Sequence, residues 1–301
     1  MQRIIGLTMI TNPDYRQDPW RESLGQALLV FDEVVVVCGD PEDPARVKKE
    51  FHDQRIVPIY LDWPQPEWTY DELARHLNFG LEKCRAMHAD WVIKFDIDCL
   101  FHENSKSQFR QCLGAMKAHG DILAQFEKLQ FFLVGRAYEK GKIPLGINMA
   151  FNVGYGVDKS RYTDLCQPII LTGDMIQYRQ GKHAIPKGDP VPERKMKPTG
   201  IHVWNYDYSF KTYDRALELL YHFDRAHANW WGAGYHGRML DDITPETAMA
   251  EYLALIKGRV EKCKKIFRPE DHPRCIQDRI RNIKPEEFGH SLWGKTEIPK
   301  L

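Results

Sequence analysis

The chain has 301 residues, with 42 Lys+Arg balanced by 42 Asp+Glu, and a sequence pI of about 7.2. This length corresponds to one large domain or two small ones, and folding buries about 75% of the surface that such a chain exposes when unfolded. The neutral charge excludes an overall basic coat for nucleic acid, although a local patch stays compatible with it. Hydrophobic residues at 43% and aromatic residues at 12% exclude a disordered chain.

The sequence has no feature of a membrane or secreted protein. Its longest apolar runs, residues 3–10 and 34–38, have the length of a strand and not the ~20 residues of a membrane helix. The N-terminus lacks the apolar core and cleavage site of a signal peptide. The seven cysteines are odd in number, scattered, and form no Cys-x-x-Cys pair. We therefore expect a soluble, cytoplasmic protein without a zinc site or disulfide framework.

Strand and helix patterns alternate over the first ~100 residues. Continuous apolar runs predict buried strands at 3–10, 33–38, 55–61 and 91–95. Between and after them, helices are expected at 19–30 (with Asp18 as N-cap), 45–51, about 70–88 and 105–119. This alternation predicts an α/β fold with a mostly parallel sheet flanked by helices, in which ligands bind beyond the carboxyl ends of the strands.

The pattern changes after residue 120. We expect strands at 121–126, 129–134 and 201–208, a mobile Gly/Pro-rich loop at 181–200, helices at 214–229 and 244–266, and an aromatic Gly-rich loop at 228–237. This predicts one α/β domain over 1–210, made of two halves that divide near residue 120. A mainly helical C-terminal extension would then cover 211–301.

Two carboxylates follow the fourth expected strand, at Asp96 and Asp98. Side chains at i and i+2 of an extended chain point the same way, so both carboxylates can meet at one spot beyond the strand. Neighbouring negative charges repel unless a cation or proton lies between them, and carboxylate oxygens suit Mg²⁺ or Mn²⁺. We therefore predict a divalent-metal site that can bridge to phosphates. The plainer alternative is a loop-capping pair.

The segment that leads to these carboxylates resembles the family 2 glycosyltransferases of GT-A fold. In that family a helix with the pattern Ala-Arg-x-x-Asn-x-Gly precedes a strand that ends in Asp-x-Asp. The corresponding residues of this chain are Ala74, Arg75, Asn78, Gly80, Asp96 and Asp98. The resemblance covers residues 3–100 well and 145–205 loosely, and it does not extend to the last hundred residues. It implies a GT-A-like, Rossmann-like fold and a nucleoside diphosphate sugar as donor. Residues 1–210 would then be the catalytic domain, with 1–120 as its nucleotide-sugar half and 121–210 as its acceptor half.

The resemblance also implies roles for residues around the donor. Thr11 would lie at the nucleoside, Asp40 would hydrogen-bond the base or ribose, and Arg75 would reach the diphosphate or sugar. Asp96 would contact the ribose or sugar, and Asp98 would bind the metal. The family usually has Asp-Asp-Gly-Ser near Asp40, whereas residues 38–41 here are Cys-Gly-Asp-Pro. The plainer alternatives are turn residues at Thr11 and Asp40 and a surface helix residue at Arg75.

The general base is implied in the same way. Residues 173–181 resemble the family segment that supplies the carboxylate of inverting enzymes, which makes Asp174 the candidate. The family often has two acids there and this chain has one. Asp189 and Glu193 are rival bases, and a helix N-cap is the structural alternative for Asp174.

A histidine and several aromatic residues complete the candidate site. His202 would join Asp98 and Asp96 in the metal shell, as a histidine does in many GT-A enzymes. A structural histidine is the alternative. Trp204, Trp230 and Trp231 are candidates for stacking on the acceptor, since tryptophan provides a flat apolar face. Burial in the core is the alternative for each of them.

The sequence thus predicts a metal-dependent glycosyltransferase (a hexosyl- or pentosyltransferase) that uses Mn²⁺ or Mg²⁺. It would move a sugar from a nucleoside diphosphate sugar to a hydroxyl of a glycan, protein or small molecule. Inversion at the anomeric carbon follows from the resemblance alone. The 181–200 loop would fold over the donor and exclude water.

Three alternatives remain. Residues 257–284 hold ten Lys/Arg against four Asp/Glu, a net charge of +6, and together with Trp230 and Trp231 they would suit a hydroxymethylated base of DNA as acceptor. A sugar nucleotidyltransferase would need a Gly-rich loop after the first strand, and residues 8–13 contain none. A sugar- or cation-binding module would retain the fold without turnover.

Overall fold

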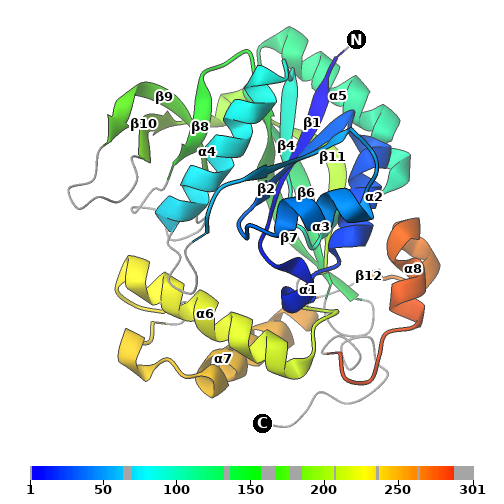
Figure 1. Cartoon of the computed structure of the whole chain (residues 1–301), viewed down its shortest axis with the longest axis vertical. Helices are drawn as coiled ribbons and strands as arrows, with labels where there is room; N and C mark the ends of the chain where they lie inside the picture. Colours follow the sequence, from blue (N-terminus) through cyan, green and yellow to red (C-terminus); the bar gives the residue numbers. More distant parts are fainter. Residues whose placement is uncertain are drawn as a thin grey trace.

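The computed structural model describes residues 2–63, 70–131, 136–156, 167–176, 185–206, 208–234, 237–262 and 265–287. A nine-stranded sheet with helices on both faces forms its centre, and a three-stranded sheet lies to one side (Figure 1). The main sheet has the order β3-β2-β1-β4-β7-β6-β11-β5, and β12 pairs with β7 outside this path. The predicted α/β class, with a sheet flanked by helices, is confirmed.

The strands of the main sheet are β1 (Ile4–Ile10), β2 (Glu33–Cys38), β3 (Ile56–Tyr60), β4 (Trp91–Lys94), β5 (Cys99–Phe101), β6 (Leu123–Phe131), β7 (Arg136–Asn148), β11 (Met196–Asn205) and β12 (Lys265–Ile266). Those of the small sheet are β8 (Val153–Gly156), β9 (Gln167–Ile176) and β10 (Ile185–Pro190). The α-helices are α1 (Pro13–Arg16), α2 (Trp20–Val30), α3 (Asp43–Glu50), α4 (Tyr70–Ala86), α5 (Lys106–His119), α6 (Tyr213–Trp231), α7 (Pro245–Val260) and α8 (Arg274–Arg281).

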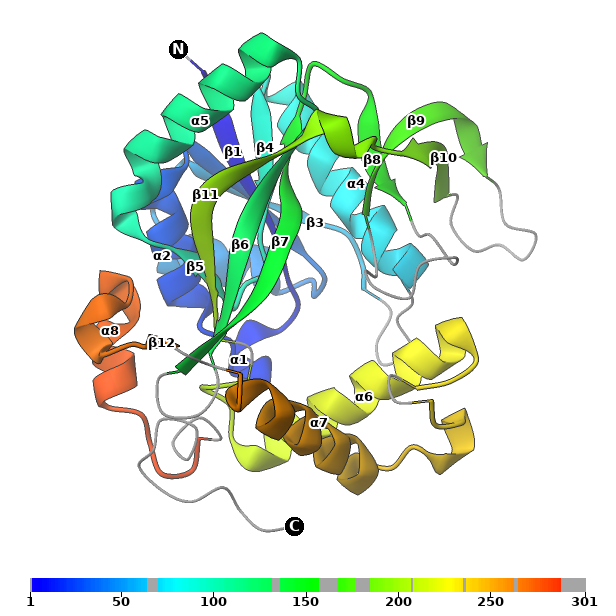
Figure 2. The same ribbon diagram turned by 180° about the vertical axis from the view of Figure 1, so that it is seen from behind.

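The four strands β3, β2, β1 and β4 are parallel to one another. β1 and β2 are almost wholly buried, as their continuous apolar sequence predicts. The carboxyl ends of these strands therefore meet at one edge of the sheet. In both views, α6 and α7 lie beyond that edge (Figure 1, Figure 2). The C-terminal region thus contributes one wall of any site at this edge.

Helices cover the two faces of the parallel strands differently. Side chains of α2, α3 and α5 form one core with one face of the sheet, and α4 packs on the opposite face. α4 approaches closely at Gly80, where an added Cβ would lie 2.4 Å from Leu7 Cδ1 and 2.8 Å from Val37 Cγ2. Two residues earlier, the Asn78 side chain donates to the Tyr155 carbonyl (2.9 Å) and accepts from its N–H (2.7 Å). The helix pattern that carries the resemblance is thus explained by packing.

Two predictions for residues 121–200 are wrong: the division into two strands at 121–134 and the loop at 181–200. The strands expected at 121–126 and 129–134 are one strand, β6, which runs through Glu127 and Lys128 with a register irregularity against β7. The segment 181–200 is not a loop where it is described, because β10 and the start of β11 occupy most of it. Pairing with β9 and β6 overrides its Gly/Pro-rich composition.

The helices of the C-terminal region also differ from the expectation. α6 continues to Trp231, so Trp230 and Trp231 are helical and the predicted loop begins at Gly232, whose φ of 85° ends the helix. α7 ends at Val260, short of the expected residue 266, and β12 then joins the main sheet. The described part of the chain from 211 onward is mainly helical. No helix within the described residues is long and apolar enough to cross a membrane.

An aromatic cluster joins the last part of the chain to the sheet. Phe131 stacks on Trp204 at 5.3 Å, and buried His272 lies 4.7 Å from the Phe131 ring. The Nδ1 atom of His272 lies 2.9 Å from the hydroxyl of Tyr206, which is also buried. Burial lowers the pKa of His272 to about 4. The sheet therefore contacts the C-terminal region through a well-packed, neutral histidine.

The close approach of α4 to the sheet gives a stability prediction. We expect Gly80→Ala to destabilise the protein by about 1–3 kcal/mol, since the overpacking outweighs the gain of about 1 kcal/mol in helix propensity. Gly25→Ala is the matched control, because an added Cβ in α2 would meet only Phe51, at 4.0 Å. It should leave stability equal or higher. Urea unfolding measures both, and a Gly80→Ala protein as stable as the control would contradict the packing.

The buried histidine gives a pH prediction. Between pH 6.5 and about 4 the unfolded chain binds a proton that folded His272 does not, so stability is complete above pH 6.5 and falls toward pH 4. The loss is on the order of 3 kcal/mol. In His272→Gln the fall in unfolding free energy between pH 6.5 and 4 should be smaller by this amount. His119→Gln, at an exposed histidine, should show the same fall as the wild type. Denaturant unfolding over this pH range measures the effect. An equal pH dependence of the unfolding free energy in all three proteins would contradict the role given to His272.

Candidate active site

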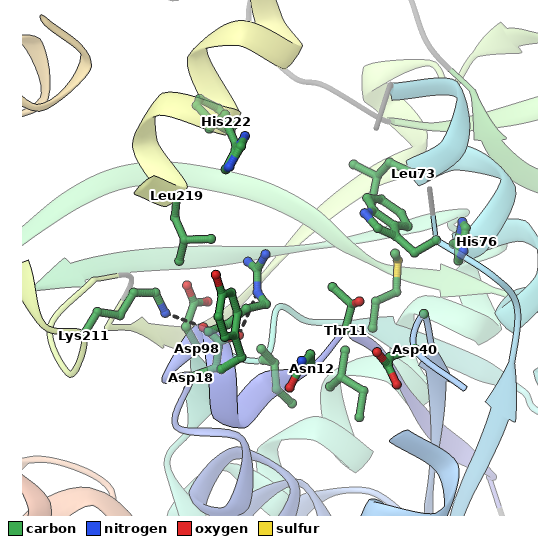
Figure 3. Close-up of a pocket in the computed structure, with 18 of the residues that line it drawn as sticks. Thr11, Asn12, Asp18, Asp40, Leu73, His76, Asp98, Lys211, Leu219 and His222 are labelled. Carbon is green, nitrogen blue, oxygen red and sulfur yellow. Dashed lines mark hydrogen bonds and ion pairs between the residues drawn. The ribbon is translucent and has the colours of Figure 1, made fainter. Parts of the chain in front are cut away.

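A pocket of about 540 Å³ lies at the carboxyl edge of the parallel strands. Residues at the ends of β1 and β2, residues after β4, and α4 form its base and one side, and α6 faces them from the other side (Figure 3). The polar and aromatic residues that line it include Thr11, Arg16, Asp18, Gly39, Asp40, Trp63, His76, Asp98, Lys211 and His222. The volume is within the range of sites that enclose a small organic ligand.

One residue of the acidic pair after β4, Asp98, lines this pocket, and Asp96 lies beside it. One potential ligand atom from each of Asp96, Asp98 and Cys99 lies within 4.8 Å of the others, and Asp98 lines the pocket. Lys94 forms an ion pair with Asp96. The Asn205 side-chain amide at the end of β11 donates to Asp98 Oδ1 at 3.0 Å. The two carboxylates therefore lie close together, as predicted. Lys94 offsets the charge of Asp96, and the Asn205 amide orients the carboxylate of Asp98.

The cysteine of this cluster differs from the carboxylates in charge. Burial, with Asp98 beside it, raises the pKa of the Cys99 thiol well above its usual range. The thiol lies 3.4 Å from Asp98 Oδ1, within reach to donate to it. The negative charge of the cluster therefore belongs to the carboxylates. Carboxylate oxygens are the ligands that hard divalent ions such as Mg²⁺ and Mn²⁺ prefer, so the donor set fits either ion.

The structure brings Thr11 and Asp40 to the same pocket as Asp98. Thr11 follows β1, and Asp40 follows β2 through Gly39, where an added Cβ would lie 2.7 Å from Trp63 Cβ and 3.1 Å from Thr11 Cβ. Only glycine allows this approach of the two loops. Asp40 Oδ1 also accepts from the Glu42 N–H at 2.9 Å, so it acts as a turn cap in addition to facing the pocket.

Arg75 is placed differently. Its guanidinium donates to Glu72 (2.8 Å) and to the Asp62 carbonyl (2.9 Å), and it does not line the described pocket. The next residue, His76, lines the pocket instead and lies between the carbonyls of Glu72 (2.7 Å) and Leu61 (2.9 Å). Arg75 and His76 together hold the chain that follows β3 against α4.

Two candidates on β11 are also placed elsewhere. His202 Nε2 lies 3.0 Å from Glu127, and the residue that reaches Asp98 is Asn205, three positions further along the strand. The antiparallel register with β5, which pairs Asn205 with Cys99, sets this arrangement. Trp204 is 7% exposed, belongs to the aromatic core cluster and does not line the pocket.

The remaining candidates are described only in part. Asp174 lies in β9 of the small sheet, and Trp230 and Trp231 form the end of α6. The side chains of these three residues lie outside the described part of the structure. The rival bases Asp189, on β10, and Glu193, in the short 3-10 helix before β11, are both exposed.

Sequence reasoning missed a charged cluster on the wall of the pocket. Asp18, expected as the N-cap of α2, makes no such cap and instead contacts Lys211 and Arg16, the latter at 3.1 Å. Asp18 and Lys211 are 193 positions apart in the sequence. No local pattern could therefore have paired them. Burial alone would raise the pKa of Asp18, but Lys211 and Arg16 outweigh burial and lower it.

Comparison with known proteins gave structural matches only. No family model and no curated protein sequence matches the chain. The structure of S. aureus TarS matches with a TM-score of 0.39 and 10% identity, covering 95% of this chain and 46% of TarS. TarS 1–349 in complex with UDP-GlcNAc matches with a TM-score of 0.31 and 12% identity over 42% of this chain and 35% of that chain.

A mannosyltransferase, PcManGT from Pyrobaculum calidifontis in complex with GDP-Man and Mn²⁺, has a TM-score of 0.31 and 17% identity, with coverage of 42% of this chain and 35% of that chain. The chain thus spans less than half the length of TarS and of PcManGT in these matches. It is similar to these proteins in structure.

The buried ion pair on the pocket wall gives a further stability prediction. Asp18→Asn leaves Lys211 buried without a counter-charge, so we expect a loss of about 3–5 kcal/mol in unfolding free energy. The double variant Asp18→Leu/Lys211→Met removes both charges and should recover most of that loss. Asp53→Asn, which removes the partner of the exposed Arg55, is the control and should change stability little. A single variant as stable as the wild type would contradict the assignment.

Proposed function

We propose that the chain is a metal-dependent glycosyltransferase that moves a sugar from a nucleoside diphosphate sugar to an acceptor hydroxyl. One observation carries the proposal. Asp98 of the acidic pair faces the same pocket as Thr11 and Asp40, which follow two neighbouring parallel strands. Ligands of open α/β sheets bind at this edge, and the volume of about 540 Å³ suits a nucleotide with an attached sugar.

Asp98 and Asp96 are the residues that would hold the metal. Their carboxylates are close enough to share one ion, and the Asn205 amide orients the Asp98 carboxylate. Such orientation by a neighbouring hydrogen bond is typical of metal ligands. A bound Mn²⁺ or Mg²⁺ would supply charge neutralisation for a diphosphate. Thr11 and Asp40 would contact the nucleoside, on the opposite side of the pocket from α6.

For the acceptor side of the reaction, the candidate base and the stereochemistry come from the sequence resemblance. Asp174 stays the candidate base on the sequence resemblance, and inversion at the anomeric carbon stays an expectation from the same source. The base must take the proton from the acceptor hydroxyl while the hydroxyl oxygen attacks the anomeric carbon. The pocket also contains His222 of α6, whose Nε2 lies 4.0 Å from Glu218. The acceptor would enter between α6 and the edge of the sheet.

The basic stretch gives little support to DNA as the acceptor. Two of its arginines pair with acids outside the stretch: Arg274 with Glu103, and Arg279 with Glu22. These pairs offset part of the +6 charge that would attract phosphates. We therefore favour a glycan, protein or small-molecule acceptor over a base in DNA.

The test is ligand-dependent stabilisation of the wild type and Asp98→Asn. The wild type is heated with nucleoside diphosphates and their sugars, with Mn²⁺ or with a chelator. A ligand at 100 times its Kd should stabilise the protein by about 2.7 kcal/mol, and we expect this only with the metal present. Asp98→Asn should lose the metal-dependent shift, whereas Asp53→Asn, at a half-buried acid on the loop before β3 that does not line the pocket, should keep it.

Turnover separates the remaining alternatives. A glycosyltransferase should slowly hydrolyse its donor in the presence of Mn²⁺ and release the nucleoside diphosphate, and Asp98→Asn should not. Binding without any release would indicate a non-catalytic module. Release of pyrophosphate from a nucleoside triphosphate and a sugar phosphate would indicate a nucleotidyltransferase. The absence of a shift with every nucleotide would contradict the proposal as a whole.

A further inference from the structure

A cluster on the pocket wall, formed by Arg16, Asp18 and Lys211, carries a net positive charge. It contains one carboxylate and two cations, so its net charge is +1. The side chains of Asp18 and Lys211 are 5% and 4% exposed, whereas that of Arg16 is 37% exposed. The buried pair is neutral on its own. The exposed cation of the cluster is therefore the guanidinium of Arg16, which lines the same pocket as Asp98 and interacts with the negative charge of that carboxylate.

Arg16 is held in place by contacts with a distant part of the chain. α1 is bracketed by Asn12 and Gln17, which both have left-handed backbone conformations with φ of 42° and 57°. The Gln17 side chain accepts a hydrogen bond from the Thr212 N–H at 2.7 Å, next to the Asp18–Lys211 pair. The short turn after β1 is thus fixed to the start of α6 at two successive residues. Such fixation places a cation before any ligand arrives, as preorganised sites require.

We propose that Arg16 binds the diphosphate of the donor, with the buried Asp18–Lys211 pair as its support. The inference rests on the proposed function and adds a second source of positive charge beside the metal carboxylates. A guanidinium suits this role because its planar fork can donate two hydrogen bonds to phosphate oxygens. Arg75, the arginine expected to reach the diphosphate, is instead bonded to Glu72 and the Asp62 carbonyl.

The role of Arg16 in the transfer step follows from the charge balance. The bond between the anomeric carbon and the diphosphate oxygen breaks, and its electron pair stays on that oxygen. The acceptor oxygen forms the new bond to the anomeric carbon, and its proton goes to the base. The leaving diphosphate gains one negative charge, which the guanidinium of Arg16 offsets while it remains protonated throughout. Arg16 therefore favours departure of the diphosphate without a proton transfer of its own.

The test compares ligands with and without the diphosphate. Wild type, Arg16→Gln and Arg21→Gln are titrated calorimetrically in Mn²⁺ with inorganic pyrophosphate, UDP, GDP, uridine and guanosine. We expect Arg16→Gln to weaken pyrophosphate and the preferred nucleoside diphosphate by about tenfold to hundredfold and to leave the nucleoside unchanged. Arg21→Gln is the matched control, because Arg21 lies on the adjoining helix, pairs with Asp14 and Glu50, and does not line the pocket. It should bind all five ligands as the wild type does.

The possible results separate the inference from the proposed function. Wild-type affinity for pyrophosphate and nucleoside diphosphates in Arg16→Gln would overturn the role of Arg16 and leave the donor site intact. A wild type that binds none of the ligands would overturn both. Arg16→Lys keeps the charge beside Asp18 but loses the planar fork, so it should show a smaller loss. If Arg16→Gln does not fold, wild-type affinity for pyrophosphate in Arg16→Lys overturns the inference.

Discussion

Electrostatic repulsion between two carboxylates at the end of β4 is the constraint on which the site depends. Asp96 and Asp98 extend from a buried strand into one small volume, where like charges raise the free energy unless a cation offsets them. Lys94 offsets the charge of Asp96, and the Asn205 amide orients Asp98. The charges of the pair are therefore partly offset without a ligand, and the proposed divalent ion would offset them further. The other lining residues, from the loops after β1 and β2 and from α6, surround this same edge of the sheet.

The second constraint is the buried Asp18–Lys211 pair, which joins the turn after β1 to the start of α6. α6 faces the carboxyl ends of the parallel strands, so this pair determines how the pocket is closed on one side (Figure 3). A buried ion pair contributes little net stability compared with apolar packing, but removal of one partner is costly. The pair is therefore better understood as a device that positions α6 and Arg16 than as a source of stability.

The parallel half of the fold and the acidic edge could be predicted from the sequence because both depend on local patterns. Continuous apolar runs indicate strands buried on both faces, and the i, i+2 spacing of Asp96 and Asp98 is sufficient to bring their carboxylates together. Pairing between distant segments could not be read in this way. The register of β11 against β5, which brings Asn205 and not His202 to Asp98, depends on residues ~100 positions apart. The Gly/Pro-rich composition of 181–200 likewise concealed strands that only their partners stabilise.

The most direct test of the account is a crystal structure with Mn²⁺ and a nucleoside diphosphate, with data collected at the manganese absorption edge. We expect one anomalous peak within coordination distance of carboxylate oxygens of Asp98 and Asp96. The nucleoside should lie beside Thr11 and Asp40, and the diphosphate should lie between the metal and Arg16. A metal peak away from both carboxylates, or a nucleotide bound outside this pocket, would contradict it.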